Sequence, residues 1–441
     1  MMAISSDPKE EEVHLRSRAK VMAGCLLGTA ALGVSACGSS DNSSSTSTPA
    51  AAGTTSSGPS GGTVDVYSSL PLQGASKDQT NAMVQGIKLA LSEAGNKAGS
   101  TTVKYESLDD STAAEGNWNA QQVGANARKA SSDKKAVAYI GEFNSGASKV
   151  SIPVLNSVGL AMISPANTYP GLTTNEPGTE KGEPDIYYPT GKRNYVRIVP
   201  RDKVQAAALA TQMKTDGCTK VAVANDKDTY GAGLARIFDT DIKTTGVKLV
   251  SDTGIQKDAA NFRAYASKIK AAGADCFFFS GVTANGAVQI TKDVAAALPN
   301  AKLYGGDGIC ESGFTNPSKK GIPASIGKNF KCTVATLDLA SIPGGPEFLK
   351  SFKAKYGTDK PDPYAIYGYE AMKLVLDTIS AGGTTRDSFL TKLFATKDRK
   401  SVIGTYSFDK NGDTSLTDYG LYDVGPDGNP TFKSVIKATA G

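Results

Sequence analysis

Residues 64–95 read VDVYSSLPLQGASKDQTNAMVQGIKLALSEAG, the pattern of a buried strand, a turn and a helix. The opening apolar run predicts a strand over 64–68, and Gly74 marks the turn that follows it. Apolar residues then recur three and four positions apart, which is the spacing of one helix face. That face consists of Met83, Ile87, Leu91 and Ala94. The segment therefore predicts one strand–helix step of an α/β sheet.

The same alternation continues along the chain. Further strands are predicted at residues 103–108, 136–140, 161–164, 221–224, 276–279 and 303–305. A second helix face is predicted at Val150, Val154, Leu155 and Val158. Strands alternating with helices favour parallel sheets covered by helices on both faces, with right-handed crossovers. Ligands of such sheets bind beyond the carboxyl ends of the strands, so we expect the site in those loops.

The N-terminus has the order of a bacterial export signal. Basic residues precede an apolar run at 21–34, and the sequence VSAC follows at 34–37. The run is too short to span a bilayer comfortably as a permanent helix. Lipoprotein processing sites have this form, so we expect a signal peptide at 1–36 and a lipid on Cys37. The alternative is an ordinary cleaved signal with a chance cysteine.

Residues 37–62 consist almost wholly of small and polar residues and are expected to be a flexible, lipidated linker. Removal of residues 1–36 from the 441-residue chain leaves enough for two lobes and too much for one core. We therefore expect an extracytoplasmic protein that its lipid anchors to the outer face of the bacterial cell membrane.

Composition excludes several classes of function. The net charge is +5, and the basic residues are scattered, so we expect no nucleic-acid partner. The single histidine, His14, lies in the predicted signal, which excludes Ser-His-Asp and Cys-His catalysis and histidine-ligated zinc. The sequence contains no P-loop and no CxxC pair. We expect no metal, no cofactor and no enzymatic activity, although carboxylate or lysine chemistry stays possible on composition alone.

Four cysteines remain after the predicted linker, namely Cys218, Cys276, Cys310 and Cys332. An even number in an exported protein suggests disulfides, with three possible connectivities. We favour Cys218–Cys276, because each residue sits at the start of an apolar, strand-like run and neighbouring parallel strands would bring them together. The other bond would then be Cys310–Cys332. It would close a loop of about twenty residues and so stabilise the folded state by roughly 3 kcal/mol on the chain-entropy model. Free buried thiols are the alternative.

A segment rich in glycine, proline and charge interrupts the pattern at residues 169–193. Connections of this length are usually functional or disordered. The segment directly follows a candidate site, so we interpret it as a rim or lid. A solvated surface insertion is the alternative.

Four segments in this order resemble one family. They are residues 64–95, IGEFNS at 140–145, AMISPANT at 161–168 and NDKDTYGAGL at 225–234. Together they resemble the extracytoplasmic solute-binding proteins of branched-chain amino acid ABC transporters, the leucine/isoleucine/valine-binding type. The resemblance covers about residues 63–435. It implies the type I periplasmic binding protein fold, with two Rossmann-like α/β lobes joined by three hinge crossovers.

The resemblance also implies where the lobes divide. Lobe one would comprise residues 63–198 and 334–404, and lobe two residues 199–333 and 405–441. The crossings are expected near Arg197, Val334 and Gly404.

In lobe one, Ser145 is predicted to begin a helix and to serve as its N-cap. Free N–H groups and a partial positive charge at a helix start suit a carboxylate, and the matching serine of the family binds the ligand's α-carboxylate. The resemblance adds Ala166, Asn167 and Thr168, whose backbone groups and threonine hydroxyl would bind a zwitterion. A plain helix cap and an ordinary polar turn are the alternatives.

In lobe two, Tyr230 is predicted to face the cleft, where its ring would cover the apolar part of a ligand. Asp307 matches a family carboxylate, usually glutamate, that pairs with the ligand's ammonium. It is one methylene shorter, and its flanking glycines allow close backbone approach. The alternatives are a surface tyrosine and a turn aspartate.

Val282 departs from the family, since leucine-type binders can carry an aromatic residue there. The segment Ala75-Ser76, which aligns with a cleft tyrosine of lobe one, has no aromatic residue either. Leucine specificity is therefore not assumed, and an aromatic amino acid, an amide or an aromatic acid is an alternative ligand.

These observations predict a monomeric solute-binding component of an ABC importer, which captures an amino acid or related ligand and delivers it to a membrane permease. A ligand-sensing receptor of the same fold is one alternative. A surface hydrolase that uses Asp307 and Glu142 is another.

Overall fold

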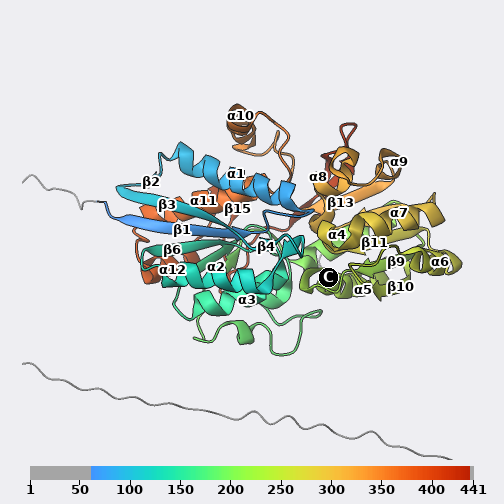
Figure 1. The fold of residues 1–441 in the computed structure, drawn as a ribbon, viewed down its shortest axis with the longest axis horizontal. Helices are drawn as coiled ribbons and strands as arrows, with labels where there is room; N and C mark the ends of the chain where they lie inside the picture. Colours follow the sequence, from blue (N-terminus) through green and yellow to red (C-terminus); the bar gives the residue numbers. More distant parts are fainter. Residues whose placement is uncertain (1–60, 438–441) are drawn as a thin grey trace, which may run out of the picture. The chain divides into compact units, whose positions relative to one another are not determined.

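The computed structural model describes residues 61–437 (Figure 1). The predicted signal peptide, the lipid site Cys37, His14 and the linker up to residue 60 lie outside the described residues, so their assignments stay predictions. Among residues 61–437, no helix combines the length and the apolar character that a membrane crossing needs.

The first sheet has six strands in the order β2-β3-β1-β6-β7-β8. Their bounds are Thr63–Leu70 (β1), Lys97–Ala98 (β2), Thr101–Asp109 (β3), Ala136–Gly141 (β6), Ala161–Ser164 (β7) and Tyr195–Arg197 (β8). All neighbours pair in parallel except β2 and β3. Figure 1 shows helix α1 on one face of the sheet and helices α2 and α3 on the other. These helices comprise Lys77–Glu93 (α1), Ala120–Ser132 (α2) and Ser145–Asn156 (α3).

Helix α11, Ala365–Ser380, returns from late in the sequence to pack against α1. Two glycines bring the helices together. A Cβ atom on Gly86 would lie 2.1 Å from the carbonyl oxygen of Ala365, and one on Gly368 would lie 2.2 Å from that of Met83. Gly86 falls inside the helical pattern of residues 64–95, and this close approach explains why a glycine occupies it.

The second sheet has seven strands in the order β10-β9-β11-β12-β13-β16-β17. Their bounds are Lys220–Asn225 (β9), Lys248–Gly254 (β10), Cys276–Ser280 (β11), Lys302–Gly305 (β12), Phe330–Val334 (β13), Asp418–Val424 (β16) and Pro430–Lys437 (β17). The sheet is parallel from β10 to β13, while β13, β16 and β17 pair antiparallel. A short turn joins β16 to β17, and only an antiparallel pair can be connected in this way. Both sheets are thus mixed and mostly parallel.

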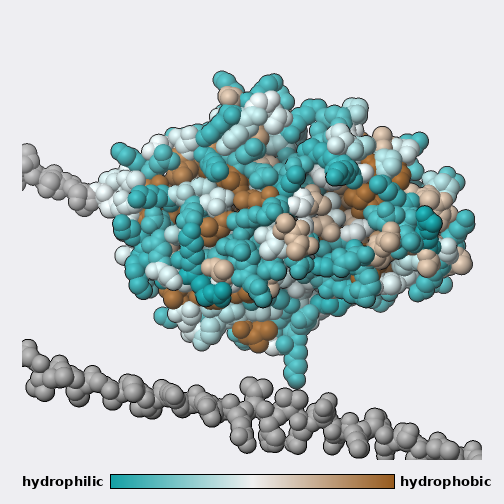
Figure 2. All heavy atoms as spheres, in the orientation of Figure 1, coloured by the Kyte–Doolittle hydropathy of each residue, from teal (hydrophilic) through white to brown (hydrophobic). Residues whose placement is uncertain are grey.

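The remaining elements complete the two layers of helices. The longer helices are Asp202–Thr215 (α4), Thr229–Thr245 (α5), Arg263–Ala271 (α6), Val288–Ala297 (α7), Gly345–Tyr356 (α10) and Arg386–Phe394 (α12). The short helices are Ser312–Thr315 (α8) and Ala324–Gly327 (α9). Two small hairpins pair Ser111–Thr112 (β4) with Asn117–Trp118 (β5), and Arg399–Ser401 (β14) with Gly404–Tyr406 (β15). On the face seen in Figure 2, hydrophilic residues predominate and apolar ones are scattered.

All seven predicted strands are present, within two residues at each end. The predicted apolar face of the second helix was wrong in part. Helix α3 ends at Asn156, so Val158 lies beyond it and is 38% exposed. Its buried apolar face consists of Ala147, Ile152 and Leu155.

Both favoured disulfides are present. Cys276 lies beside Val221 in the parallel register of β11 and β9, and the Cα atoms of Cys218 and Cys276 are 5.9 Å apart. Cys310 follows β12 and bonds to Cys332 in the adjacent strand β13, with 5.5 Å between the Cα atoms. Strand pairing therefore brings both pairs together, as expected for the first.

Removal of the bond between Cys310 and Cys332 is expected to lower the free energy of unfolding by about 3 kcal/mol, because the open chain regains loop entropy. The double variant Cys310→Ser, Cys332→Ser should show this loss in urea unfolding. Alkylation before and after reduction, followed by mass spectrometry, checks the pairing. Four alkylatable thiols after the linker before reduction would contradict it.

Three connections join the sheets. The chain leaves the first sheet after Arg197 and returns toward it after Val334. The third connection runs from Tyr406 to Asp418, somewhat beyond Gly404. Beyond Gly404 the chain still contacts a helix that packs on the first sheet. The Tyr406 hydroxyl donates a hydrogen bond to Glu370 of α11 at 2.8 Å.

Candidate functional site

Loops at the carboxyl ends of the two sheets meet around a small cavity. Its volume is about 10 Å³, which is room for about one water molecule. The lining residues are Phe143, Asn144, Ser145 and Ala166 from the first sheet, and Tyr230, Val282, Asp307 and Gly308 from the second. Five of the seven residues expected to bind ligand thus line one cavity, and they come from both sheets.

Ser145 lies at the cavity as the first residue of α3, and it is 2% exposed. The predicted N-cap role was wrong, because Asn144 occupies that position with extended backbone. The first N–H groups of a helix have no acceptor within the helix. Ser145 therefore presents both a hydroxyl and a free helix start to the cavity, a combination that suits an anion.

Asn167 and Thr168 do not line this cavity. The Asn167 amide donates to the carbonyls of Glu142 and Phe143 at 3.0 and 2.9 Å, and its oxygen accepts a hydrogen bond from Tyr195 at 3.1 Å. Its side chain therefore joins the two loops of lobe one that form the site. The Thr168 hydroxyl is buried without a hydrogen-bond partner.

Asp307 is 5% exposed and is held by hydroxyl donors. Tyr230, in the first turn of α5, donates to Oδ1 at 2.7 Å. Tyr364 donates to Oδ2 at 2.9 Å. Burial raises the pKa of the Asp307 carboxyl, and the hydrogen bonds that it accepts lower it in part. No basic side chain lines the cavity, so its one charged side chain is an acid.

Sequence reasoning missed Tyr364 and Phe143. Tyr364 stands directly before α11, more than fifty residues beyond Asp307, and no local pattern connects the two. Phe143 brings an aromatic ring to the cavity from within IGEFNS. The cavity therefore has an aromatic residue in lobe one, although Val282 and Ala75-Ser76 supply none.

The two lobes are in direct contact beside the cavity. The indole Nε1 of Trp118 donates to Asp228 Oδ2 at 3.0 Å, and the amide of Asn117 donates to Asn285 Oδ1 at 3.2 Å. Trp118 and Asn117 belong to the β4–β5 hairpin of lobe one, whereas Asp228 caps α5 of lobe two. The structure thus has its two sheets closed on each other at this edge.

Segment 169–193 also reaches lobe two. Arg236 of α5 donates from Nε and Nη2 to the carbonyl of Gly178 at 3.0 and 2.9 Å. Within the segment, Tyr169 and Tyr187 both donate to the buried Glu183 at 2.6 Å. The segment is therefore packed, and it lies against α5 near the closed edge.

Glu142 does not line the cavity. It is fully buried, and it accepts a hydrogen bond from Tyr139 at 2.9 Å. The pair of carboxyls that a hydrolase would need is therefore not presented to one cavity. Among residues 61–437, no group of three histidine, cysteine, aspartate or glutamate side chains could hold a metal ion.

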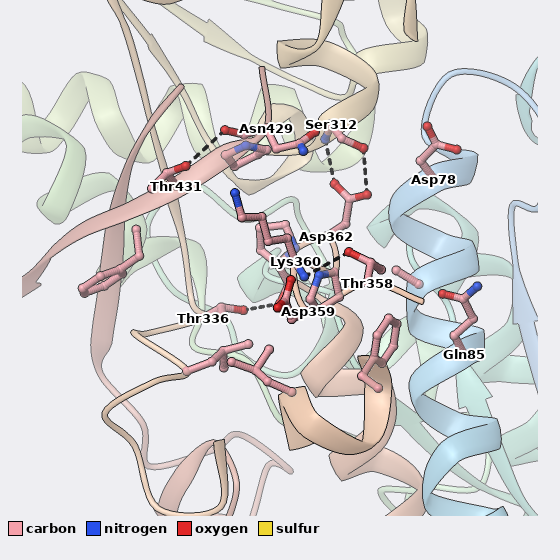
Figure 3. Close-up of a pocket in the computed structure, with 18 of the residues that line it drawn as sticks. Asp78, Gln85, Ser312, Thr336, Thr358, Asp359, Lys360, Asp362, Asn429 and Thr431 are labelled. Carbon is pink, nitrogen blue, oxygen red and sulfur yellow. Dashed lines mark hydrogen bonds between the residues drawn. The ribbon is translucent and has the colours of Figure 1, made fainter. Parts of the chain in front are cut away.

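A larger cavity, of about 1160 Å³, lies elsewhere (Figure 3). Its wall includes Asp78 and Gln85 of α1, the segment 336–340, residues 358–363 and the start of β17. None of the seven predicted ligand residues borders it.

Two α/β lobes that meet at a polar cavity define a type I periplasmic binding protein. The chain belongs to the periplasmic binding protein family, whose sequence model matches residues 68–429. Members of this family are solute-binding proteins.

Relatives and solved structures agree with this assignment. An "Amino acid binding protein" of Pseudomonas aeruginosa is 26% identical over 66% of this chain and 72% of its own length. "Leu/Ile/Val-binding protein homolog 3" of Brucella melitensis is 26% identical over 62% of this chain and 69% of its own. A leucine-binding protein of Thermotoga maritima has the same fold, with a TM-score of 0.72 at 22% identity over 85% of this chain and 99% of that one. A solute-binding protein of R. palustris in complex with benzoate has a TM-score of 0.70 at 18% identity, over 85% of this chain and 97% of that one.

Proposed function

We propose that this chain is the extracytoplasmic solute-binding component of an ABC importer, which captures an amino acid or a related small amphiphilic ligand between its lobes. One observation carries the proposal, namely that Ser145 of lobe one and Asp307 of lobe two line the same cavity. A helix start with a hydroxyl suits a carboxylate, and a buried carboxyl suits an ammonium. The two ends of a zwitterion would thus be bound by different lobes.

A ligand held in this way stabilises the closed state, because only closure brings both groups to it. The cavity of about 10 Å³ is too small for an amino acid, so the lobes must move apart from the arrangement seen here both to admit a ligand and to hold it. Lobe one would comprise 63–198 with 334–404, and lobe two 199–333 with 405–441. Ala166 and Thr168 would add backbone and hydroxyl contacts, with Asn167 positioning that loop.

The lipid expected on Cys37 would hold the protein at the outer face of the cell membrane. We expect the protein to act there as a monomer. Tethering raises its effective concentration at one permease, to which the closed form would deliver its ligand.

A thermal-shift screen with amino acids, amides and aromatic acids tests the proposal, because a ligand that binds the folded state raises its apparent stability. Calorimetry with the best compound should then give one site per chain. Ser145→Ala should weaken binding about tenfold or more, as expected when one good hydrogen bond to a charged group is lost. Ser92→Ala, at an exposed position of α1, is the control. No response to the whole panel would contradict the proposal.

Trp118 should report closure, since its indole bonds to Asp228 of lobe two. Ligand addition to the full chain is expected to change the emission of this single tryptophan. Trp118→Phe should abolish the signal but leave calorimetric affinity within a few-fold, because one part-buried hydrogen bond is worth about 1 kcal/mol. An emission spectrum that ligand saturation leaves unchanged would count against movement at this edge.

A further inference from the structure

Glu311 is a fully buried acid that lies close to the cavity without lining it. It directly precedes α8 and stands three residues after Gly308, which lines the cavity. Neither of its carboxyl oxygens has a hydrogen-bond partner. A buried carboxyl that lacks donors is costly, so its retention needs a reason.

Polar groups from both lobes surround Glu311. Burial is the largest influence on the pKa of its carboxyl and, with the charges of Asp362 and Asp78, raises it to about 8. The hydroxyls of Thr283 and Ser76 lie near enough to lower that pKa, but neither meets the distance and angle of a normal hydrogen bond to the carboxyl oxygens. Ser76 stands at the start of α1 in lobe one, and Thr283 follows the cavity residue Val282 in lobe two. Glu311 therefore lies where the lobes meet.

Two groups of α1 on the same side are also without partners. The Ser76 hydroxyl is buried and unbonded, as are both amide atoms of Gln79, one turn further along. The lobes are tightly apposed here, since a Cβ atom on Gly313 would lie 2.5 Å from the carbonyl oxygen of Ala75. Several unbonded polar atoms thus gather at one contact between the lobes.

The charged side chains near Glu311 already form hydrogen bonds or ion pairs with other residues. Ser312 donates its N–H and hydroxyl to Asp362 at 2.7 and 2.8 Å, which fixes the backbone next to Glu311 (Figure 3). The nearby cation, Lys319, contacts the Ser312 hydroxyl at 2.7 Å and Asp78 at 3.1 Å. Glu311 is therefore held in place, and no cation of the chain forms an ion pair with it among the described residues.

We propose that Glu311, with Ser76 and Gln79, forms a second polar subsite that takes a nitrogen donor of the ligand other than the ammonium expected at Asp307. This inference rests on the proposed function and narrows its ligand class. A ligand with an ammonium, guanidinium or amide N–H on its side chain would give the buried carboxyl its missing donor. Apolar amino acids and plain aromatic acids would leave it unpaired.

The test compares lysine with norleucine, which has the same chain without the terminal amine, and includes arginine, glutamine and benzoate. The wild-type full chain should bind at least one of the nitrogen-bearing amino acids at least tenfold more tightly than norleucine. Glu311→Gln should reduce binding of a cationic ligand at least tenfold and leave norleucine within twofold. Glu347→Gln, at an exposed position of α10, should change neither.

The inference would be overturned if wild type and Glu311→Gln preferred the nitrogen-bearing amino acid over norleucine to the same degree. It would also be overturned if the wild type bound norleucine or benzoate more tightly than the nitrogen-bearing amino acids. The melting temperature of the ligand-free protein is a second readout. It should stay the same or rise in Glu311→Gln, because the carboxyl accepts no hydrogen bond of normal geometry. A fall of several degrees would show that the carboxyl has a structural role, and it would overturn this inference. Failure of every compound to bind the wild type would instead refute the proposed function, so the two failures can be told apart.

Discussion

Replacement of Asp307 by asparagine is expected to abolish high-affinity ligand binding and to leave the fold intact. In the proposed closed complex this carboxylate pairs with the ligand's ammonium away from water. Loss of one partner of such a buried charge pair costs about 2–5 kcal/mol, a factor of roughly 30 or more in affinity. Asparagine keeps the shape and an acceptor for the hydroxyl of Tyr230 or Tyr364, so the local packing should persist. Calorimetry with the best compound of the ligand screen measures the loss.

Asp387→Asn is the matched control, because Asp387 is exposed on α12. It should leave affinity unchanged. A circular dichroism spectrum and a melting temperature of Asp307→Asn close to those of the wild type would show that the loss is local. Affinity within threefold of the wild type would refute the role of Asp307 as the ammonium partner.

Local patterns in the sequence predicted the parts of the fold that depend on neighbouring residues. Strand β7, Ala161–Ser164, is found at its predicted residues, because its short apolar run is flanked by turn residues on both sides. Strands β16 and β17 were not predicted. Strand β17 is the edge strand and most of its side chains are exposed. Strand β16 is buried only over residues 419–422, a short run that contains a glycine and is flanked by aspartates, so it gives no clear apolar pattern.

The residues of the site also fall into a group that the sequence indicates and a group that it does not. Ser145, Tyr230 and Asp307 each follow a predicted strand, so the topology of parallel sheets places them at one edge. The resemblance supplied their roles. Tyr364 and Glu311 depend on contacts between distant segments, and no spacing in the sequence indicates them. Ser145 was misassigned as the N-cap because Asn144, which precedes it, is an equally good cap residue.

Replacement of Asp413 by alanine is expected to destabilise the protein more than any surface change. Asp413 Oδ1 lies 2.8 Å from Nε of Arg197, whose side chain is fully buried. Removal of one partner of a buried ion pair leaves an uncompensated charge and costs about 3–5 kcal/mol. The hydroxyl of Thr173 would also lose its two contacts with the carboxylate, at 2.9 and 3.0 Å. Urea unfolding followed by Trp118 fluorescence measures the loss.

The same substitution should also weaken ligand binding, because the pair connects the hinge to the site. Arg197 ends β8 at the first connection between the sheets, and Asp413 lies in the third. The guanidinium donates to the carbonyls of Asn167 and Tyr169 at 3.1 and 2.8 Å, and so holds the loop beside the cavity. The double variant Arg197→Met, Asp413→Ala should lose less stability than the sum of the single changes, since no unpaired charge remains. Strictly additive losses would show that the two side chains do not act as a pair.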